Sequence, residues 1–373
     1  MWYGTDAPPP GGPEALSVAP MLDCTDRHFR YLARLLSKRT VLYGEMLWDS
    51  EVAKCAAQGP DAIEELLGYS ASEHPVVAQL GGSTPELMER GAERLAHYGY
   101  DSVNLNAGCP AKSGPCFGAE LMKQPRVIGE LCAAIGRGAQ APATLKCRIG
   151  VDDFDSAADL DAVLGAAIGA GVDHVVIHAR KAILGLDPAK NRSIPPLRYD
   201  VVHGLVDAYP QLRITLNGGV KTLKDARVEI DIWGVHGVMI GRQAYAEPWM
   251  LADADRVMFG QPNRSISREE VISAYAVYAD EAVEAASASR RSTTFRTTLR
   301  PLHGFFTSSR CSKAWRNGML EEQGKARRRE DCLLPSEVIE AVVSSLRSTA
   351  AGLEELERRP YDADGDGGSR LCL

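Results

Sequence analysis

The sequence lacks several features that would assign it to a membrane or secreted class. No hydrophobic run among its 373 residues is long enough to span a bilayer. The first residues, MWYGTDAPPPGGPEA, have neither the basic region nor the apolar core of a secretory signal, and they are too acidic and too poor in Arg for an organellar transit peptide. We therefore expect a cytoplasmic protein without a membrane partner, or an organellar one if a targeting segment has been removed.

The cysteines lack the spacing of a metal site or of a disulfide framework. There are nine, an odd number, spread irregularly and without a C-x-x-C pair. Paired spacings are typical of structural zinc sites, and even counts are typical of disulfide-rich secreted domains. We expect free thiols in a reducing compartment and no bound metal ion.

Positive charge is scarce over the chain as a whole, but it is concentrated in one segment. The net charge is −7, which by itself argues against a nucleic-acid partner. Between residues 285 and 329, however, eleven Lys or Arg stand against only Glu321 and Glu322. A polyanion responds to charge within about 10 Å at ordinary salt, so this segment could bind one.

What is present is a repeated strand–helix pattern. Short apolar or β-branched runs at 15–21, 41–47, 76–82, 102–109, 143–150, 174–180, 213–219 and 237–242 are each followed by a helix-like segment. Pro85 suits a first helical position, and residues 157–169 repeat apolar residues at helical spacing. Eight repeats in about 240 residues predict a (β/α)₈ TIM barrel. A doubly wound open sheet is the alternative, but it favours a G-x-G-x-x-G turn after its first strand, and the sequence has none there.

Helices alone follow the last predicted strand. Ser267 and Glu270 form a capping box that opens a helix to about residue 286, and further helices are expected near 292–307, 310–321 and 336–350. We therefore expect a disordered segment over 1–14, a barrel over 15–260, a small helical domain over 261–352 and a disordered tail over 353–373.

Polar side chains collect at the predicted strand ends, where the function of such barrels resides. Any one of them could be a structural residue with satisfied hydrogen bonds, but burying so many without a ligand would cost about 1–3 kcal/mol for each unsatisfied group. They are Met21 and Asp23, Glu45, Gln79, Asn104, Asn106 and Cys109, Lys146 and Arg148, His178 and Arg180, Asn217 to Gly219, and Gly241 with Arg242. Glycines after strands seven and eight suit a phosphate, and the remaining groups suit a planar hydrogen-bonding ring. Flavin mononucleotide (FMN) fits this set, with a Lys placed to stabilise the anionic reduced flavin.

One cysteine lies where a buried strand opens into a loop, in the stretch NLNAGCPAKSGPCFGAELM. Cys109 could be a metal ligand, a disulfide partner of Cys116, a buried filler or a reactive group. Metal binding is disfavoured because no second ligand stands at zinc spacing.

Longer segments resemble a known family. The sequence is similar to the tRNA-dihydrouridine synthases of the A type, over about residues 17–320. The matching segments are VAPMLDCTDRHFRYLARLLS, LYGEML, HPVVAQLGGS, NLNAGCP with FGAELM, LKCRIGVDD, IHARKAILGLDP, NRSIPPL, LNGGV and GVMIGRQAYAEPW.

The resemblance implies a reaction and a set of site residues. NADPH would reduce FMN, a hydride would pass to C6 of a uracil at position 20 or 20a of the tRNA D-loop, and Cys109 would protonate C5. FMN would be held by Ala19, Pro20, Met21, Gln79, Lys146, His178, Asn217, Gly218, Gly219, Gly241 and Arg242. The tRNA would contact Asn106, Arg180, Arg192, Lys313 and Arg316. A neutral thiol is a competent acid at neutral pH, and we expect a monomer.

The helical domain would supply the phosphate contacts that base extraction requires. Arg296 with Arg300, and Arg310, Lys313 and Arg316, are spaced to share helix faces, with Phe295, Phe305, Phe306 and Trp315 interleaved. Such faces can also be merely solvated. The chain departs from the family pattern at Ala189, Lys313 and Glu120, and its loop AKSGPC after Cys109 is two or three residues shorter than usual.

Two other functions remain open at this point. A small-molecule flavoenzyme resembling dihydroorotate or dihydropyrimidine dehydrogenases shares an Asn-rich fourth strand, but it has no use for a basic helical domain. A catalytically weak tRNA-binding protein that retains FMN is the second, because the short loop carries the cysteine. Comparing the turnover of wild type with that of Cys109→Ala would distinguish a catalytically weak tRNA-binding protein from an active enzyme.

Overall fold

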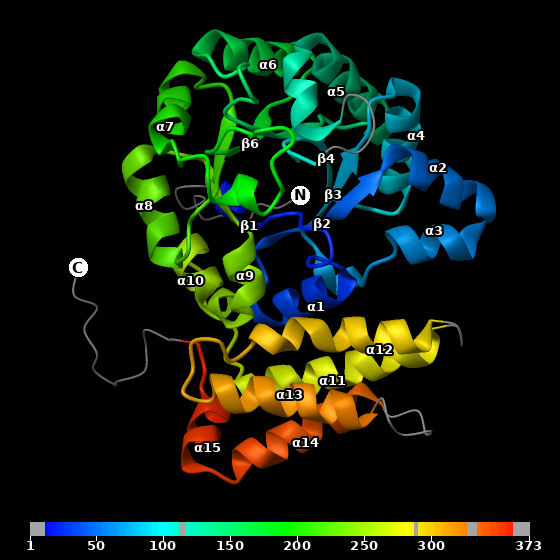
Figure 1. Cartoon of the computed structure of the whole chain (residues 1–373), viewed down its shortest axis with the longest axis vertical. Helices are drawn as coiled ribbons and strands as arrows, with labels where there is room; N and C mark the ends of the chain where they lie inside the picture. Colours follow the sequence, from blue (N-terminus) through cyan, green and yellow to red (C-terminus); the bar gives the residue numbers. More distant parts are fainter. Residues whose placement is uncertain (1–11, 112–116, 287–289, 327–333, 361–373) are drawn as a thin grey trace. The chain divides into compact units, whose positions relative to one another are not determined.

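The computed structural model describes residues 12–111, 117–286, 290–326 and 334–360 (Figure 1). By their internal contacts these residues form two compact units, one of residues 12–30 and 39–243 and the other of residues 31–38 and 244–360. The domain limits expected at residues 260 and 352 stay predictions; the contacts group residues 244–260 with the helices that follow.

The first unit is a closed barrel of eight parallel strands in sequence order. The strands are β1 Leu16–Val18, β2 Val41–Trp48, β3 Val76–Gly81, β4 Ser102–Ala107, β5 Thr144–Arg148, β6 His174–His178, β7 Arg213–Asn217 and β8 Gly237–Ile240. β1 closes the barrel by pairing with β8, with Ser17 opposite Met239. The predicted (β/α)₈ barrel is confirmed, and the open sheet is wrong.

Helices surround these strands, as Figure 1 shows for α4 to α8. The helices wholly within this unit are α2 Asp49–Gln58, α3 Pro60–Leu67, α4 Pro85–His97, α5 Pro125–Ala139, α6 Ala157–Gly169, α7 Tyr199–Ala208 and α8 Leu223–Trp233, with short 3₁₀ turns η1 Gly12–Glu14, η2 Ala71–Glu73, η3 Gly118–Lys123 and η4 Lys190–Arg192. Two more helices, α1 Arg27–Leu36 and α9 Arg242–Ala246, are each divided between the two units. α4 starts at Pro85 as predicted, because proline suits the first helical position. α6 begins after a capping box of Ser156 and Asp159.

Inside the barrel, side chains from alternate strand positions pack in layers. A buried apolar layer contains Val41, Tyr43, Val77, Val176 and Met239. Because strand side chains alternate, the residues two positions further along point to the same interior. The polar residues at the strand ends therefore lie above this layer, toward the mouth formed by the carboxyl ends of the strands.

The opposite end of the barrel is closed by a charged group on η1. The Glu14 carboxylate lies 3.0 Å from His174 Nδ1 and 2.9 Å from Arg213 Nη1. Burial lowers the pKa of His174 to about 4. Burial alone would raise the pKa of Glu14, but the interactions with His236, whose Nε2 lies 3.7 Å from the carboxylate, and with His174 and Arg213 lower it to about 2. Gly12–Glu14 is thus ordered, contrary to the predicted disorder of 1–14; residues 1–11 lie outside the described part.

The second unit is helical, as predicted. It contains η5 Pro248–Asp253, α10 Ala254–Phe259, α11 Arg268–Ala285, α12 Arg291–Leu299, η6 Arg300–Gly304, α13 Ser312–Ala326, α14 Pro335–Arg347 and α15 Ala350–Glu357. α11 starts at the predicted capping box of Ser267 and Glu270. Phe305, Phe306 and Trp315 are fully buried and form its core.

The last helix corrects the expected tail. Disorder was predicted from residue 353, but α15 runs from Ala350 to Glu357 after an N-cap at Thr349. Leu356 is buried, and the nearly buried Glu355 forms an ion pair with Arg268. These distant contacts, rather than local sequence, hold the helix. Residues 361–373 lie outside the described part.

Among the described residues, no helix combines the length and the apolar character that crossing a bilayer requires.

Candidate active site

The barrel gathers the predicted cofactor residues at its mouth. Gln79 is on β3, Lys146 on β5, His178 and Asn217 end β6 and β7, and the others directly follow strands. Those that follow strands are Ala19, Pro20 and Met21 after β1, Gly218 and Gly219 after β7, and Gly241 with Arg242 after β8. Strand pairing places His178 opposite Asn217, and Asn106 opposite Lys146.

The turn after β7 requires glycine. Gly218 and Gly219 have φ angles of +110° and +81°, a region that other residues rarely adopt. A Cβ on Gly218 would lie 2.4 Å from His178 Cδ2, and one on Gly219 would lie 2.4 Å from Leu197 Cδ1. The Tyr199 hydroxyl donates to the Gly218 carbonyl oxygen at 2.5 Å and fixes the turn. Both the φ angles and the close packing against His178 and Leu197 therefore exclude a side chain at these two positions.

Positive groups crowd the same mouth. Burial, followed by the charge of Arg148, lowers the pKa of Lys146 to about 8. The pKa of Arg148 falls to about 10 through burial and the charges of Arg180 and Arg192. Burial, then Arg148, Lys146, Arg180 and Arg242, hold the pKa of His178 well below its usual value. The groups repel one another, so an anion at this site would be stabilised.

Asn217 orients the buried lysine. Lys146 Nζ donates to Asn217 Oδ1 at 3.0 Å, while Asn217 Nδ2 donates to the Met239 carbonyl oxygen at 2.8 Å. The ammonium group is therefore held at the mouth by a side chain that is itself fixed by β8. This pair can place a positive charge beneath a bound ring.

Cys109 follows β4 and is half-buried. The N–H groups of Gly108 and Cys109 both donate to Asn106 Oδ1 at 3.0 Å. The Cys109 carbonyl oxygen accepts from Ala119 N–H at 2.8 Å, and Gly118, at φ +59°, passes so close that a Cβ would lie 2.4 Å from that oxygen. The backbone of Cys109 is thus held by hydrogen bonds at both its N–H group and its carbonyl oxygen.

Arg148 is a site residue that the residue assignments from the family did not include. Its Nε donates to the Gly108 carbonyl oxygen at 2.8 Å, and its Nη1 donates to the Lys181 carbonyl oxygen at 3.2 Å. The guanidinium thus connects the cysteine turn to the loop after β6. Its place two residues after Lys146, at a strand end, was the signal available in the sequence.

Two other roles were considered for Cys109, as a disulfide partner and as a metal ligand. The thiol is free, and its suggested partner Cys116 lies outside the described residues, as does most of the short loop at 112–116. In the described part of the chain, no group of three or more His, Cys, Asp or Glu could hold a metal ion. Cys132 and Cys147 are fully buried, as expected of core residues.

The loop after β6 carries two predicted tRNA residues. Arg180 Nη1 donates to the Pro195 carbonyl oxygen, and the exposed Arg192 accepts from Arg242 Nη2 at 3.4 Å through its own carbonyl oxygen. The loop is thereby tied to the turn after β8. The guanidinium of Arg192 remains exposed at the surface of the barrel.

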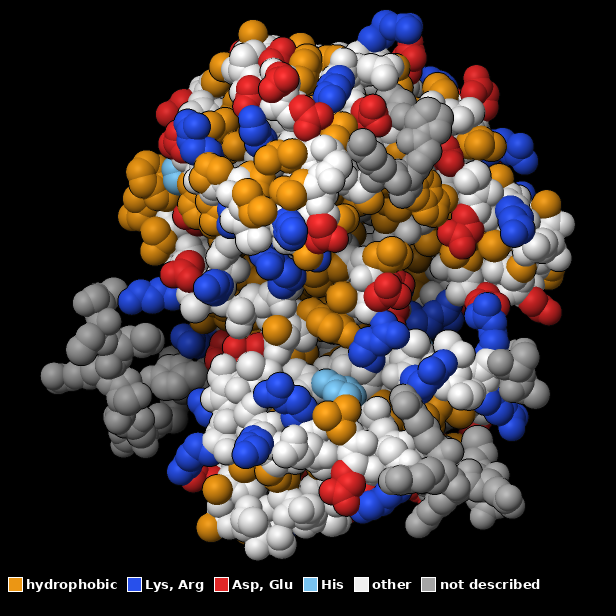
Figure 2. All heavy atoms as spheres, viewed as in Figure 1, with side chains coloured by type: hydrophobic (Ala, Val, Ile, Leu, Met, Phe, Trp, Pro, Cys, Tyr) orange, Lys and Arg blue, Asp and Glu red, His pale blue; other side chains and the backbone are white. Residues whose placement is uncertain are grey.

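The basic segment of the helical unit is arranged differently from the prediction. Lys313 and Arg316 are exposed on α13, but Arg310 precedes that helix and pairs with Glu354 at 2.5 Å. The three therefore do not share one helix face. Phe305, Phe306 and Trp315 are buried and cannot stack on RNA bases. Figure 2 shows Lys and Arg side chains spread over this unit's visible face.

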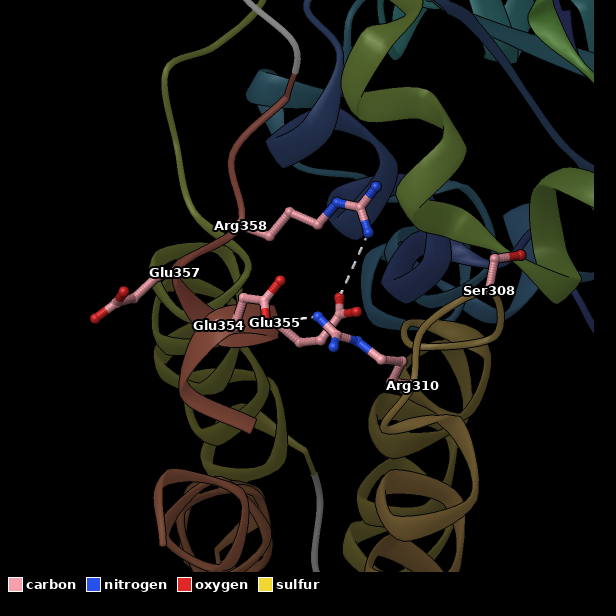
Figure 3. A pocket seen from close by; sticks show the side chains of 6 residues that line it. All are labelled: Ser308, Arg310, Glu354, Glu355, Glu357 and Arg358. Carbon is pink, nitrogen blue, oxygen red and sulfur yellow. Dashed lines mark ion pairs between the residues drawn. The ribbon is translucent and has the colours of Figure 1, made fainter. Parts of the chain in front are cut away.

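A surface pocket of about 570 Å³ lies within the helical unit (Figure 3). It is lined by Ser308, Arg310, Glu354, Glu355, Glu357 and Arg358. Its arginines already pair with its glutamates, Arg310 with Glu354 at 2.5 Å and Arg358 with Glu355 at 3.7 Å. The arginines of this pocket are thus paired with carboxylates, in contrast to the unbalanced positive charge of the barrel mouth.

Fold and mouth together define a (β/α)₈ barrel protein with an anion-attracting site and a backbone-anchored cysteine. The family model described as dihydrouridine synthase matches residues 17–342. The chain belongs to the dihydrouridine synthase family.

Its relatives include several proteins named tRNA-dihydrouridine(20/20a) synthase. The one from Shewanella oneidensis is 39% identical over 312 residues, covering 83% of this chain and 89% of the relative. The one from Synechocystis sp. is 39% identical over 310 residues, covering 82% and 88%. The one from Vibrio cholerae is 38% identical over 314 residues, covering 83% and 91%.

Proposed function

We propose that this protein is an enzyme that reduces uridine to 5,6-dihydrouridine in the D-loop of tRNA, at position 20 or 20a, with FMN as cofactor and NADPH as reductant. The reaction and position follow the names of the relatives, which cover most of the chain. Membership in the family disfavours a small-molecule dihydropyrimidine oxidoreductase. A monomeric, cytoplasmic protein is part of the proposal.

The observation that carries the proposal is the joint placement of Cys109 and the cationic mouth. The cysteine turn is hydrogen-bonded to Asn106 on β4, and Asn106 pairs in register with Lys146 on β5. A proton donor and a positively charged ring-binding group therefore lie on neighbouring strands. That is the arrangement that reduction of a flat pyrimidine beside a cofactor needs.

The residues present fit FMN. Gly218 and Gly219 form a turn packed so closely against His178 and Leu197 that no side chain fits there. Burial, followed by the neighbouring cations, lowers the pKa of Lys146 and of His178, and a phosphate or an anionic ring would offset the repulsion among those cations. Arg242 would join Gly241 at the phosphate, and Gln79 and Asn217 would hydrogen-bond the ring system. Bound FMN, reduced by NADPH, supplies the hydride for C6 of the uracil.

The chain's own residues complete the reaction. Asn106 would orient the base, and Cys109 would give its thiol proton to C5 as negative charge develops there, leaving a thiolate that solvent reprotonates. Arg148 holds the carbonyl of Gly108 and so fixes the turn from which the thiol acts. Positive charge from Arg148 would also stabilise the thiolate after the transfer.

Arg180 and Arg192 on the barrel, with Lys313 and Arg316 on the helical unit, would contact the RNA. Arg192, Lys313 and Arg316 are exposed. Such contacts would hold the backbone while the base is extracted from the folded loop.

The test is dihydrouridine formation in tRNA that lacks this base, with NADPH and FMN-loaded protein. Wild type is expected to form product and Cys109→Ala to lose at least a hundredfold in rate, since proton donors contribute 10²–10⁴-fold. Flavin-loaded wild type that binds the tRNA but forms no product would instead support the tRNA-binding protein.

A further inference from the structure

A chain of hydrogen bonds links three buried side-chain amides, those of Asn106, Gln79 and Asn104, to the hydroxyl of Thr144. Gln79, Asn104 and Thr144 are in register on β3, β4 and β5, and they are 2%, 0% and 5% exposed. Gln79 Nε2 donates to Asn104 Oδ1 at 2.8 Å, and Asn104 Nδ2 donates to Thr144 Oγ1 at 2.8 Å. At the other end, Asn106 Nδ2 donates to Gln79 Oε1 at 3.0 Å. We call these four residues the amide ladder.

The direction of the ladder is fixed by chemistry at its upper end. The backbone N–H groups of Gly108 and Cys109 can only donate, so the amide oxygen of Asn106 must face them. Its NH₂ group then faces Gln79, which must present its oxygen and turn its own NH₂ toward Asn104. The same logic turns the NH₂ of Asn104 toward Thr144. Each amide orientation therefore depends on the next.

Thr144 ends the ladder because a hydroxyl can accept this last hydrogen bond while it also bonds another group. A hydroxyl has one hydrogen and two lone pairs, so accepting from Asn104 leaves its own hydrogen free for another acceptor. A residue of the same shape without the hydroxyl would leave the Asn104 NH₂ with no acceptor. Reversing the amides to relieve this would turn the Asn106 NH₂ against two backbone N–H donors.

We propose that Thr144 is a positioning residue for Cys109, acting through Asn104, Gln79 and Asn106 on the backbone turn that carries the thiol. Thr144 lies at the closed end of the ladder, three amides away from that turn. The consequence for catalysis rests on the proposed function of Cys109. The structural part of the proposal, that Thr144 holds the N–H groups of residues 108 and 109 in place, does not depend on that function.

The experiment compares Thr144→Val with Thr144→Ser and with Thr215→Val, all loaded with FMN. Serine keeps the accepting hydroxyl. Thr215 is a matched control because it is 1% exposed in the same barrel and bonds His174 at 2.8 Å, outside the ladder. We expect amide hydrogen exchange at Gly108 and Cys109 to be at least tenfold faster in Thr144→Val, and within twofold of wild type in the other two.

Activity provides the second readout. Thr144→Val should lower kcat for dihydrouridine formation about tenfold, with KM for tRNA unchanged. The loss in kcat should exceed any change in the rate of flavin reduction by NADPH, which can itself change because Gln79 of the ladder is also assigned to the flavin. Thr144→Ser should restore kcat to within twofold of wild type. Equal losses in Thr144→Val and Thr215→Val, in either readout, would overturn the inference, because they would show only a general loss of stability.

The two proposals fail in different ways. If wild type forms no dihydrouridine, the proposed function fails, while exchange at Gly108 and Cys109 still tests the ladder. If wild type is active and exchange at these amides is the same in Thr144→Val as in wild type, the ladder is refuted and the function stands.

Discussion

The turn after β7 gives a prediction that separates backbone strain from loss of the ligand site. We consider Gly218→Ala beside Gly171→Ala. Both glycines have left-handed φ angles, +110° and +90°. A Cβ on Gly171 meets nothing within 4 Å, whereas one on Gly218 would lie 2.4 Å from His178 Cδ2 and 3.3 Å from Leu197 Cδ2. The two substitutions share the strain and differ in the clash.

The magnitudes follow from these two terms. Holding an alanine at such a φ costs about 1–3 kcal/mol, so Gly171→Ala should lower the free energy of unfolding by that amount. Gly218→Ala adds overpacking against the His178 ring, about 1–3 kcal/mol more. Because His178 must move, the site for the cofactor changes as well. We expect FMN affinity to fall at least tenfold in Gly218→Ala and to stay within twofold of wild type in Gly171→Ala.

The assays are urea unfolding followed by circular dichroism, and titration of FMN fluorescence quenching into the ligand-free protein. Urea unfolding measures the combined cost of backbone strain and steric clash, and the FMN titration measures the effect on the cofactor site alone. If the two variants lose the same unfolding free energy and bind FMN equally well, the role assigned to the Gly218 turn in the cofactor site is refuted. A stable Gly218→Ala that binds FMN like wild type would refute it equally.

Three further predictions concern charge. Because the pKa of Lys146 is about 8, its charge is largely present at pH 7, halved near pH 8 and lost above it; FMN affinity should fall about twofold from pH 7 to 8 and then toward tenfold per pH unit, and equal behaviour in Lys146→Met would contradict this. Replacing Lys313 and Arg316 by Gln should reduce the slope of log K against log salt for tRNA by about 1.4 to 1.8, while Lys325→Gln, whose charge is already paired with two glutamates on α13, should leave it unchanged. Glu355→Gln should cost about 3–5 kcal/mol in urea unfolding, because it leaves a buried arginine without its counter-charge; a loss below 1 kcal/mol would refute that account.

Much of the fold and the mouth could be predicted from sequence, for a geometric reason. Strand–helix alternation fixes the connectivity of a barrel, and the connectivity brings all eight carboxyl strand ends to one mouth. Residues as far apart as Gln79 and Asn217 could therefore be assigned to one place. Local signals also located α6, through its apolar repeat over 157–169, and α11, through the capping box of Ser267 and Glu270.

The features that sequence reasoning missed depend on contacts between distant residues. Strand register decides that Thr144 stands beside Asn104, and no local pattern reveals register inside a parallel barrel. α15 is held through Glu355 by Arg268, which is 87 residues away in the sequence. Phe306 and Trp315 lie among basic residues in sequence yet are buried. Trp315 is on the buried side of α13 while Lys313 and Arg316 are exposed, and Phe306, in the turn after η6, packs against Trp315 with their ring centroids 4.7 Å apart.

The crowded cations of the barrel mouth have a consequence for the lifetime of the protein. Their lowered pKa values mean that Lys146 and Arg148 oppose folding while no anion lies between them. A ligand present at a hundred times its Kd stabilises the native state by about 2.7 kcal/mol, and fewer chains then open to proteases. If FMN is that anion, as proposed, its concentration in the cell would set how many copies of this protein survive, before any effect on how fast each one works.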